Sequence, residues 1–105
     1  GVGVLLRAAE PLSGLEAMYQ ARAAARRDTD LASGPGKLSQ AFGITHALDG
    51  ADLVRGSQGI VIVDDGTPPP ARPVVGPRIG ISRAKDFPWR WHVPAHPHVS
   101  VRERR

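Results

Sequence analysis

The sequence predicts an α+β fold: a curved, mainly antiparallel sheet with a few short helices, in a single domain. Three observations predict this class. Short apolar and β-branched runs recur along the chain and indicate several short strands. Two helix signals lie among them. A length of 105 residues with 12 Gly and 10 Pro fits one domain of short elements.

The chain opens with a predicted strand and a predicted helix. Residues 2–6 form a continuous apolar run, typical of a buried strand. Because the chain opens within this run and without Met, we expect it to be a fragment of a larger domain. Ser13 and Glu16 have the spacing of a capping box, which predicts a helix that ends near Arg27. Its apolar stripe would contain Leu12, Leu15, Met18, Tyr19 and Ala23.

The middle of the chain predicts a loop, a short helix and another strand. Residues 28–36 are polar and rich in turn formers. Residues 37–42 predict a short helix, and Gly43 is placed to end it. A turn is expected at 49–52, followed by a β-branched strand at 60–63.

The last third predicts a Pro-rich loop and the remaining strands. The loop spans 66–77 and contains one PxxP sequence, which leaves a protein-interaction role open beside that of a simple connection. Strands are expected at 78–82 and at 89–93, where apolar and polar residues alternate. Residues 99–101 would close the sheet.

Composition and charge limit the possible functions. The chain has no Cys, which excludes disulfides, thiolate metal sites and a cysteine nucleophile. No apolar run approaches the roughly 20 residues that cross a bilayer. Residues 66–105 carry eight Lys and Arg against two acidic residues, which favours a polyanionic partner such as nucleic acid. The basic segment 102–105 is equally typical of a solvated tail.

The sequence Gly34-Pro35-Gly36-Lys37 indicates an anion site. A Gly-rich turn that opens a helix presents backbone N–H groups and here also a Lys. It is not a Walker P-loop, because Leu31 and Leu38 stand where that motif needs Gly and Ser or Thr. One backbone phosphate would fit such a turn, and an ordinary helix start remains the alternative.

Other constellations predict little chemistry. His92, His96 and His98 have the spacing of metal ligands on one face of a strand. Pro94 and Pro97 interrupt that strand and no acidic residue lies beside it, so we expect no metal. The chain shows no convincing pair of groups for general acid–base catalysis.

Arg7 ends the first apolar run, where a charge must be paired or face a site. It either faces a functional site or pairs with Glu10 to hold the end of the strand.

Several segments, taken in order, resemble the alkyladenine (3-methyladenine) DNA glycosylases. The resemblance covers nearly the whole chain and is weakest in residues 53–77. The matching segments are 5–12, 34–44, 78–82, 88–91 and 99–100.

The resemblance implies base-excision DNA repair: a damaged purine is flipped out of duplex DNA and its N-glycosylic bond is hydrolysed. These enzymes use no metal or other cofactor. Their general-base Glu and their inserted Tyr both precede the Leu-Leu-Arg segment. The chain therefore resembles the C-terminal half of such an enzyme, and we expect it to be inactive alone.

The resemblance also assigns site residues. Arg7 and the backbone carbonyl of Ile79 match positions that hold the attacking water. Arg22 and Lys37 match phosphate contacts, and His46 stands where some members have Lys. The Gly34–Gly36 turn matches the anion site described above.

The implied partner is duplex DNA that contains a damaged purine, bound by a monomer in the bacterial cytoplasm near the nucleoid, without a membrane. Two alternatives remain open. One is a non-catalytic DNA-binding module of the same fold, and the other is a protein-interaction domain that uses the Pro-rich loop.

Overall fold

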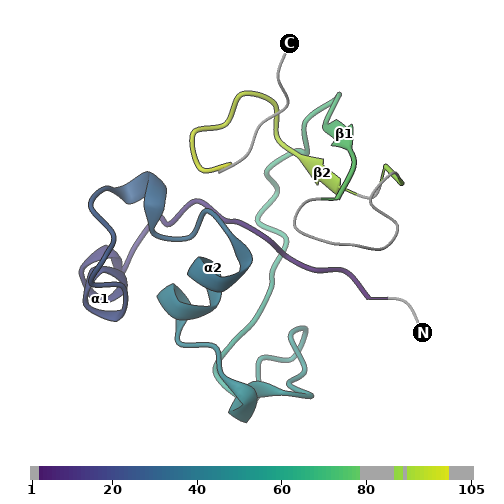
Figure 1. The fold of residues 1–105 in the computed structure, drawn as a ribbon. Helices are drawn as coiled ribbons and strands as arrows, with labels where there is room; N and C mark the ends of the chain where they lie inside the picture. The colour runs from purple at the N-terminus through teal and green to yellow at the C-terminus, as the bar shows by residue number, and fades with distance from the viewer. Residues whose placement is uncertain (1–2, 79–86, 89, 100–105) are drawn as a thin grey trace.

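The computed structural model describes residues 3–78, 87–88 and 90–99, and within them the predicted α+β class is confirmed (Figure 1). Helices α1 (Leu15–Ala21) and α2 (Pro35–Phe42) lie together on one side of the molecule. Strands β1 (Val74–Gly76) and β2 (Arg90–His92) lie on the other. Two 3₁₀ turns, η1 (Asp28–Asp30) and η2 (His46–Leu48), follow α1 and α2 respectively.

The core of the described residues is small and lies between the two helices. Its apolar side chains are those of Met18, Ala25, Leu31, Ala32 and Ala41, with Leu15, Tyr19 and Leu38 packed against them. Three of the α1 side chains predicted to form a stripe therefore face the core, since they recur at helical spacing. The folded state of these residues depends on few buried groups.

Helix α1 differs from its prediction at both ends. Gly14, with φ 71°, is the N-cap and no side chain caps the helix, so the capping box at Ser13 is wrong. The helix ends at Ala21 instead of Arg27 because Arg22 leaves helical geometry, with φ −127°. Its guanidinium turns inward to the carbonyl groups of Asp30 and Leu31, at the end of η1. Leu12 and Ala23 are consequently exposed outside the helix.

Helix α2 ends at Phe42 as predicted, but it begins two residues before the predicted start at residue 37. It begins at Pro35, a residue whose fixed φ suits the first helical position. Gly43 ends it in the left-handed region, with φ 65°. The N–H groups of Gly43 and Ile44 donate to carbonyl groups of the last turn, at 3.3 and 2.8 Å. Local sequence thus fixes both ends of this helix.

The described strands form one antiparallel pair, with Val75 opposite Trp91. Strand β2 confirms the strand predicted at 89–93 for residues 90–92, and residue 89 lies outside the described residues. Strand β1 lies inside the segment predicted as the Pro-rich loop 66–77, so that loop ends earlier than expected. The two adjacent Val residues at 74–75 were the β-branched signal that the Pro content obscured.

Two predicted strands are absent from the described residues. Residues 3–6 and 60–63 are without strand pairing. In 3–8 no backbone group is hydrogen-bonded to another described backbone group, and in 60–63 one bond joins Ile62 N–H to the Leu53 carbonyl at 2.9 Å. A strand needs a ladder partner as well as β-forming residues. The expected strand segments 79–82 and 100–101, and the tail 102–105, lie outside the described residues.

A turn at 49–50 agrees with the turn expected at 49–52, and Gly50 adopts φ 80° there. Among the described residues, no helix has the length and apolar character that crossing a membrane requires.

Candidate functional site

A cleft of about 1080 Å³ lies between the N-terminal segment and the residues around β2. In Figure 1 the N-terminal segment runs across the molecule from the side of the strands to α1. Residues 3–10 form one wall and residues 90–93 belong to another. Its charged and polar lining includes Arg7, Glu10, Arg78, Arg90, His92 and His98.

Arg7 is half-buried and lines this cleft. Arg90 is close enough for the two positive charges to interact: burial first, and then the charge of Arg7, lowers the pKa of the Arg90 guanidinium. The guanidinium groups of Arg7 and Arg90 therefore lie close together at one cleft, which Glu10 also lines.

Glu10 interacts with His96 and not with Arg7. Its Oε1 lies 3.1 Å from His96 Nε2, and no hydrogen bond or ion pair joins Glu10 to Arg7 within the described chain. The backbone N–H of His98 donates to His96 Nδ1 at 3.2 Å, so Nδ1 holds a lone pair. In the neutral ring the proton is therefore on Nε2, and this N–H donates a hydrogen bond to Glu10 Oε1. This pair joins the N-terminal segment to the C-terminal turn.

The three His residues line the same cleft, and two of them come close to each other. The rings of His96 and His98 are 5.5 Å apart between centroids. The ring atoms His92 Nε2 and His98 Nδ1 are buried and have no hydrogen-bond partner among the described residues. Over the described part of the chain, no group of three or more His, Asp or Glu side chains is arranged to hold a metal ion.

A second cluster surrounds Asp30 between the two helices. The Arg22 side chain is 8% exposed. Its Nη1 donates to the carbonyl groups of Asp30 and Leu31, the latter at 3.3 Å, and its Nε donates to Gln40 Oε1 at 3.2 Å. Arg22 therefore satisfies backbone carbonyl groups inside the protein, a contact that its sequence position did not indicate.

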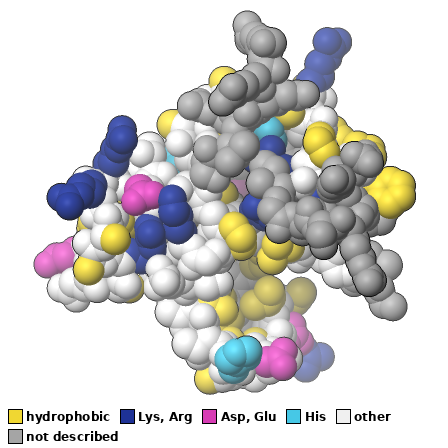
Figure 2. Space-filling model, in the orientation of Figure 1, with side chains coloured by type: hydrophobic (Ala, Val, Ile, Leu, Met, Phe, Trp, Pro, Cys, Tyr) yellow, Lys and Arg dark blue, Asp and Glu magenta, His cyan; other side chains and the backbone are white. Residues whose placement is uncertain are grey.

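Lys37 lies on the open side of the same cluster. Its side chain is 39% exposed, and Nζ lies 2.6 Å from Asp30 Oδ1 and 3.4 Å from Ser33 Oγ. The hydrogen bond from Lys37 holds the pKa of the Asp30 carboxyl below its ordinary value of 3.8, and the charges of Lys37 and Arg22 act in the same direction. Figure 2 shows Lys and Arg side chains gathered on the α1 side of the molecule, with acidic groups among them.

Gly34, Gly36 and Lys37 meet at the start of α2, as the sequence predicted. Gly34 is the N-cap in extended backbone, and Lys37 is in the first turn. First-turn N–H groups have no acceptor within the helix, so they are available to an anion. A side chain at Gly36 would meet no atom within 4 Å, so packing does not require glycine there.

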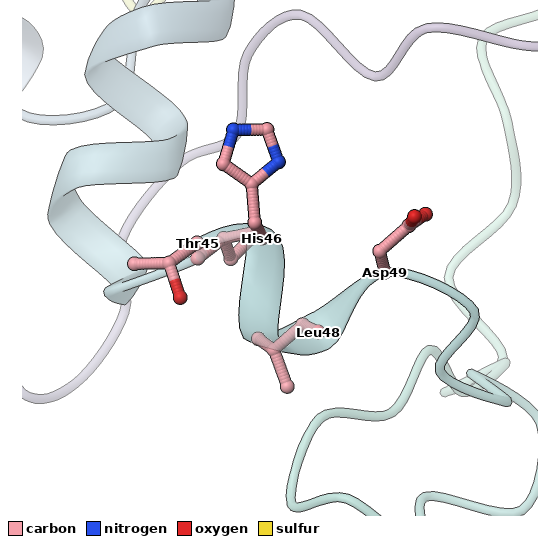
Figure 3. A pocket seen from close by; sticks show the side chains of 5 residues that line it. Thr45, His46, Leu48 and Asp49 are labelled. Atoms are coloured by element: carbon pink, nitrogen blue, oxygen red, sulfur yellow. The ribbon is translucent and has the colours of Figure 1, made fainter.

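His46 is exposed on η2 and lines a shallow hollow of about 760 Å³ with Thr45, Leu48 and Asp49. Its ring and the Leu48 side chain point to opposite sides of the turn (Figure 3). Within the described residues it forms no ion pair. Ile79, the other water-positioning residue expected from the sequence, lies outside the described residues.

Sequence reasoning missed the roles of Asp30 and Asp28, because Asp is a common turn former. Besides the contacts of Asp30, the Tyr19 hydroxyl donates to Asp28 Oδ1 at 2.6 Å, and this bond raises the pKa of Tyr19. The sequence held one signal for these contacts: both Asp residues lie between a helix that carries Tyr19 and Arg22 and the following Lys37.

Comparison with known proteins agrees with the resemblance seen in the sequence. Residues 1–97 match the family model described as Methylpurine-DNA glycosylase (MPG). A Burkholderia orbicola (strain MC0-3) protein named as a 3-methyladenine DNA glycosylase is 56% identical over 100 residues, which are 95% of this chain and 48% of that protein. Similarly named proteins from Methanocella arvoryzae and Chlorobaculum parvum are each 44% identical, over 94% and 93% of this chain and 50% and 46% of theirs. The chain spans about half the length of these curated relatives.

Proposed function

Since the chain belongs to the methylpurine-DNA glycosylase family, we propose that it supplies one half of a base-excision DNA-repair enzyme. The enzyme would hydrolyse the N-glycosylic bond of flipped alkylated or deaminated purines in duplex DNA. The family match over residues 1–97 is the observation that carries this proposal. The chain would correspond to the C-terminal half of the enzyme.

In this proposal the cleft that Arg7 lines is the water side of the active site. Its guanidinium would orient the attacking water and keep a nearby carboxylate ionised. The half-buried position of Arg7 and the absence of a bond to Glu10 support this assignment. The Ile79 carbonyl would accept a hydrogen bond from the same water. The general base and the inserted aromatic residue would come from the remaining half of the domain.

The start of α2 would hold the DNA backbone. Lys37, the Gly34–Gly36 turn and His46 would contact phosphate groups, which position a duplex without reading its sequence. Arg22 is buried behind Lys37, so its contacts favour a supporting role in this site. A direct phosphate contact by Arg22 stays a prediction.

The partner would be duplex DNA with one damaged purine, bound by a monomer. We place the enzyme with the DNA of the bacterial cytoplasm, since several of the matched relatives are bacterial.

Base release by two proteins tests this function. One is the chain itself. The other, the joined protein, is a single chain in which the unmatched residues of the Burkholderia orbicola relative precede residue 1. Each is incubated in excess with duplex DNA that contains one hypoxanthine or ethenoadenine. We expect release by the joined protein alone, because general-base catalysis contributes about 10²–10⁴-fold and the base lies outside this chain.

Either of two results would contradict the proposal. Release by the chain alone at a comparable rate would show that the catalytic groups lie within these 105 residues. DNA binding by the joined protein without release of either base would support the non-catalytic module instead.

A further inference from the structure

We propose that His96 is a positioning residue: its contact with Glu10 holds the segment that carries Arg7 in place at the cleft. The proposal rests on the function proposed above, because it concerns the placement of the residue assigned there to the attacking water. Neither the motifs of the sequence nor the family resemblance gave His96 a role of this kind.

The Glu10–His96 pair links two walls of the cleft. Glu10 ends the N-terminal wall, His96 lies in the turn at residues 94–98 that follows β2, and both residues line the cleft. Glu10 Oε1 is 3.1 Å from His96 Nε2, and the two side chains are 46% and 29% exposed, so water competes with the contact only in part. In Figure 1 the yellow turn after β2 reaches the N-terminal segment.

The segment that carries Arg7 has two attachments close to that residue. On the helical side, the Ala9 N–H donates to the carbonyl of the fully buried Ala32 at 3.0 Å. On the strand side, the Glu10 side chain reaches His96. The first attachment fixes one point of the backbone, and a contact with a second element is needed to fix the direction of the segment. The pair therefore limits where the half-buried Arg7 side chain lies relative to the opposite wall.

The turn orients the His96 ring toward Glu10. The His98 N–H donates to His96 Nδ1 at 3.2 Å, and the Val99 N–H donates to the His96 carbonyl at 3.1 Å. The centroids of the His96 and His98 rings are 5.5 Å apart, so the second ring restricts the first. Since Nδ1 acts as an acceptor, Nε2 is the ring nitrogen that donates. A ring held in this way is suited to keep one carboxylate at one position.

The backbone before His96 also indicates a turn that its contacts determine. Ala95 has φ 53°, the positive φ of a residue other than glycine in the described part of the chain. This left-handed conformation is unfavourable for a residue with a Cβ and persists where surrounding contacts hold it. The bonds that His96 forms with His98, Val99 and Glu10 are such contacts.

Two substitutions separate the two side-chain bonds of His96. The amide oxygen of Asn lies at about the position of Nδ1, so His96→Asn can still accept from the His98 N–H, as in an Asx turn, but is too short to reach Glu10. Gln is one methylene longer, so the amide of His96→Gln can donate to Glu10 in place of Nε2. The two variants therefore differ in which bond they keep.

Single-turnover base release, DNA affinity and Tm are compared in the joined protein. We expect His96→Asn to release hypoxanthine or ethenoadenine at least about fivefold more slowly than wild type, and His96→Gln to stay within about twofold of it. DNA affinity and Tm should be nearly the same in all three. Glu10→Ala should match His96→Asn, and the double variant should be no slower than either alone, because both changes remove one contact.

Three kinetic results would overturn the proposal. One is a wild-type rate of release in His96→Asn. Another is an equal loss in His96→Asn and His96→Gln, because the bond to Glu10 would then not be what matters. The third is full additivity of Glu10→Ala and His96→Asn, which would make their effects independent.

Nitrogen NMR of the joined protein at pH 8 tests the contact without base release. We expect the His96 ring to carry its proton on Nε2 alone, and the Arg7 Nε–Hε signal to shift in His96→Asn but not in His96→Gln. A proton on Nδ1 alone, or an Arg7 signal that His96→Asn leaves unchanged, would overturn the proposal whether or not bases are released. If the NMR results are as expected but the wild-type joined protein releases no base, the proposed function fails and the placement of Arg7 by the pair stands.

Discussion

Lys37 and Arg22 both approach Asp30, yet their surroundings differ. Lys37 extends into solvent at the start of a helix, whereas Arg22 is enclosed and bonded to carbonyl groups. An exposed cation can exchange its carboxylate for a phosphate at little cost. A buried one that satisfies backbone carbonyl groups cannot leave without stranding them. The family resemblance, which placed both at phosphate contacts, gave no means to separate them.

The first residue-scale prediction concerns Lys37→Ala in the joined protein. Affinity for damaged and undamaged duplex DNA should fall about equally, and the slope of log K against log salt should become shallower by about 0.9. Arg55→Ala is the control, because Arg55 is an exposed cation, at 83%, that pairs with Asp52 and lies outside the residues of α2. A loss confined to damaged DNA would contradict a backbone contact.

Arg22→Ala should act on stability. Removal of the guanidinium takes away the donor to the Asp30 carbonyl and to the buried Leu31 carbonyl. This loss should lower the free energy of unfolding by about 1–3 kcal/mol. Urea unfolding of the joined protein measures this loss. An unchanged urea midpoint, together with a shallower salt dependence of DNA binding, would contradict this role and support a direct contact between Arg22 and phosphate.

At the scale of elements, the predictions that the structure confirms relied on residues close together in the sequence, and the wrong ones needed contacts with distant residues. Helix α2 was predicted because Gly34, Lys37 and Gly43 act within one or two turns. The early end of α1 depends on carbonyl groups eight and nine residues beyond Arg22, which sequence periodicity does not contain. The strands expected at 2–6 and 60–63 were wrong within the described residues because their pairing needs distant partners.

Two glycines at the ends of α2 should respond oppositely to the same substitution. Gly43→Ala should destabilise the joined protein by about 1 kcal/mol, because φ 65° is unfavourable for a residue with a Cβ. Gly36→Ala should stabilise it by up to about 1 kcal/mol, since Ala favours a helix and open space surrounds the site.

Gly36→Ala should nevertheless weaken DNA binding if the first turn of α2 holds a phosphate, because a methyl group would keep the anion from the backbone. Thermal unfolding and filter binding on the same two variants separate the effects. Unchanged affinity in Gly36→Ala would remove the Gly34–Gly36 turn from the DNA interface.

The Asp30 cluster gives a pH prediction. The pKa of Asp30 is lowered in the folded protein, so its contribution to stability is present above its unfolded value near 3.8 and is lost as pH falls through the lower folded value. Asp30→Asn should therefore lower Tm at pH 7, and the difference from wild type should shrink below pH 4. A difference that stays constant down to pH 2 would contradict the ionic role of Asp30.

At the scale of the whole molecule, the described chain has one small core between two helices and an open cleft beside a two-stranded ribbon. Fold class and family could be predicted from the sequence, because ordered motifs along most of the chain carry them. The contact between Glu10 and His96 could not, since it joins residues far apart that no shared pattern links. The proposed site at Arg7 came from family resemblance, and the structure adds that Arg7 lines the cleft.

The single-turnover excision rate of Arg7→Lys in the joined protein tests the central claim, that Arg7 orients the attacking water. Lys keeps the charge and loses the planar guanidinium, so the substitution separates geometry from charge. We expect the rate of hypoxanthine or ethenoadenine release to fall at least about tenfold, equivalent to about 1.4 kcal/mol of barrier, with Tm and DNA affinity nearly unchanged. A lower Tm with a wild-type excision rate in the folded fraction would contradict the claim and make Arg7 a structural residue.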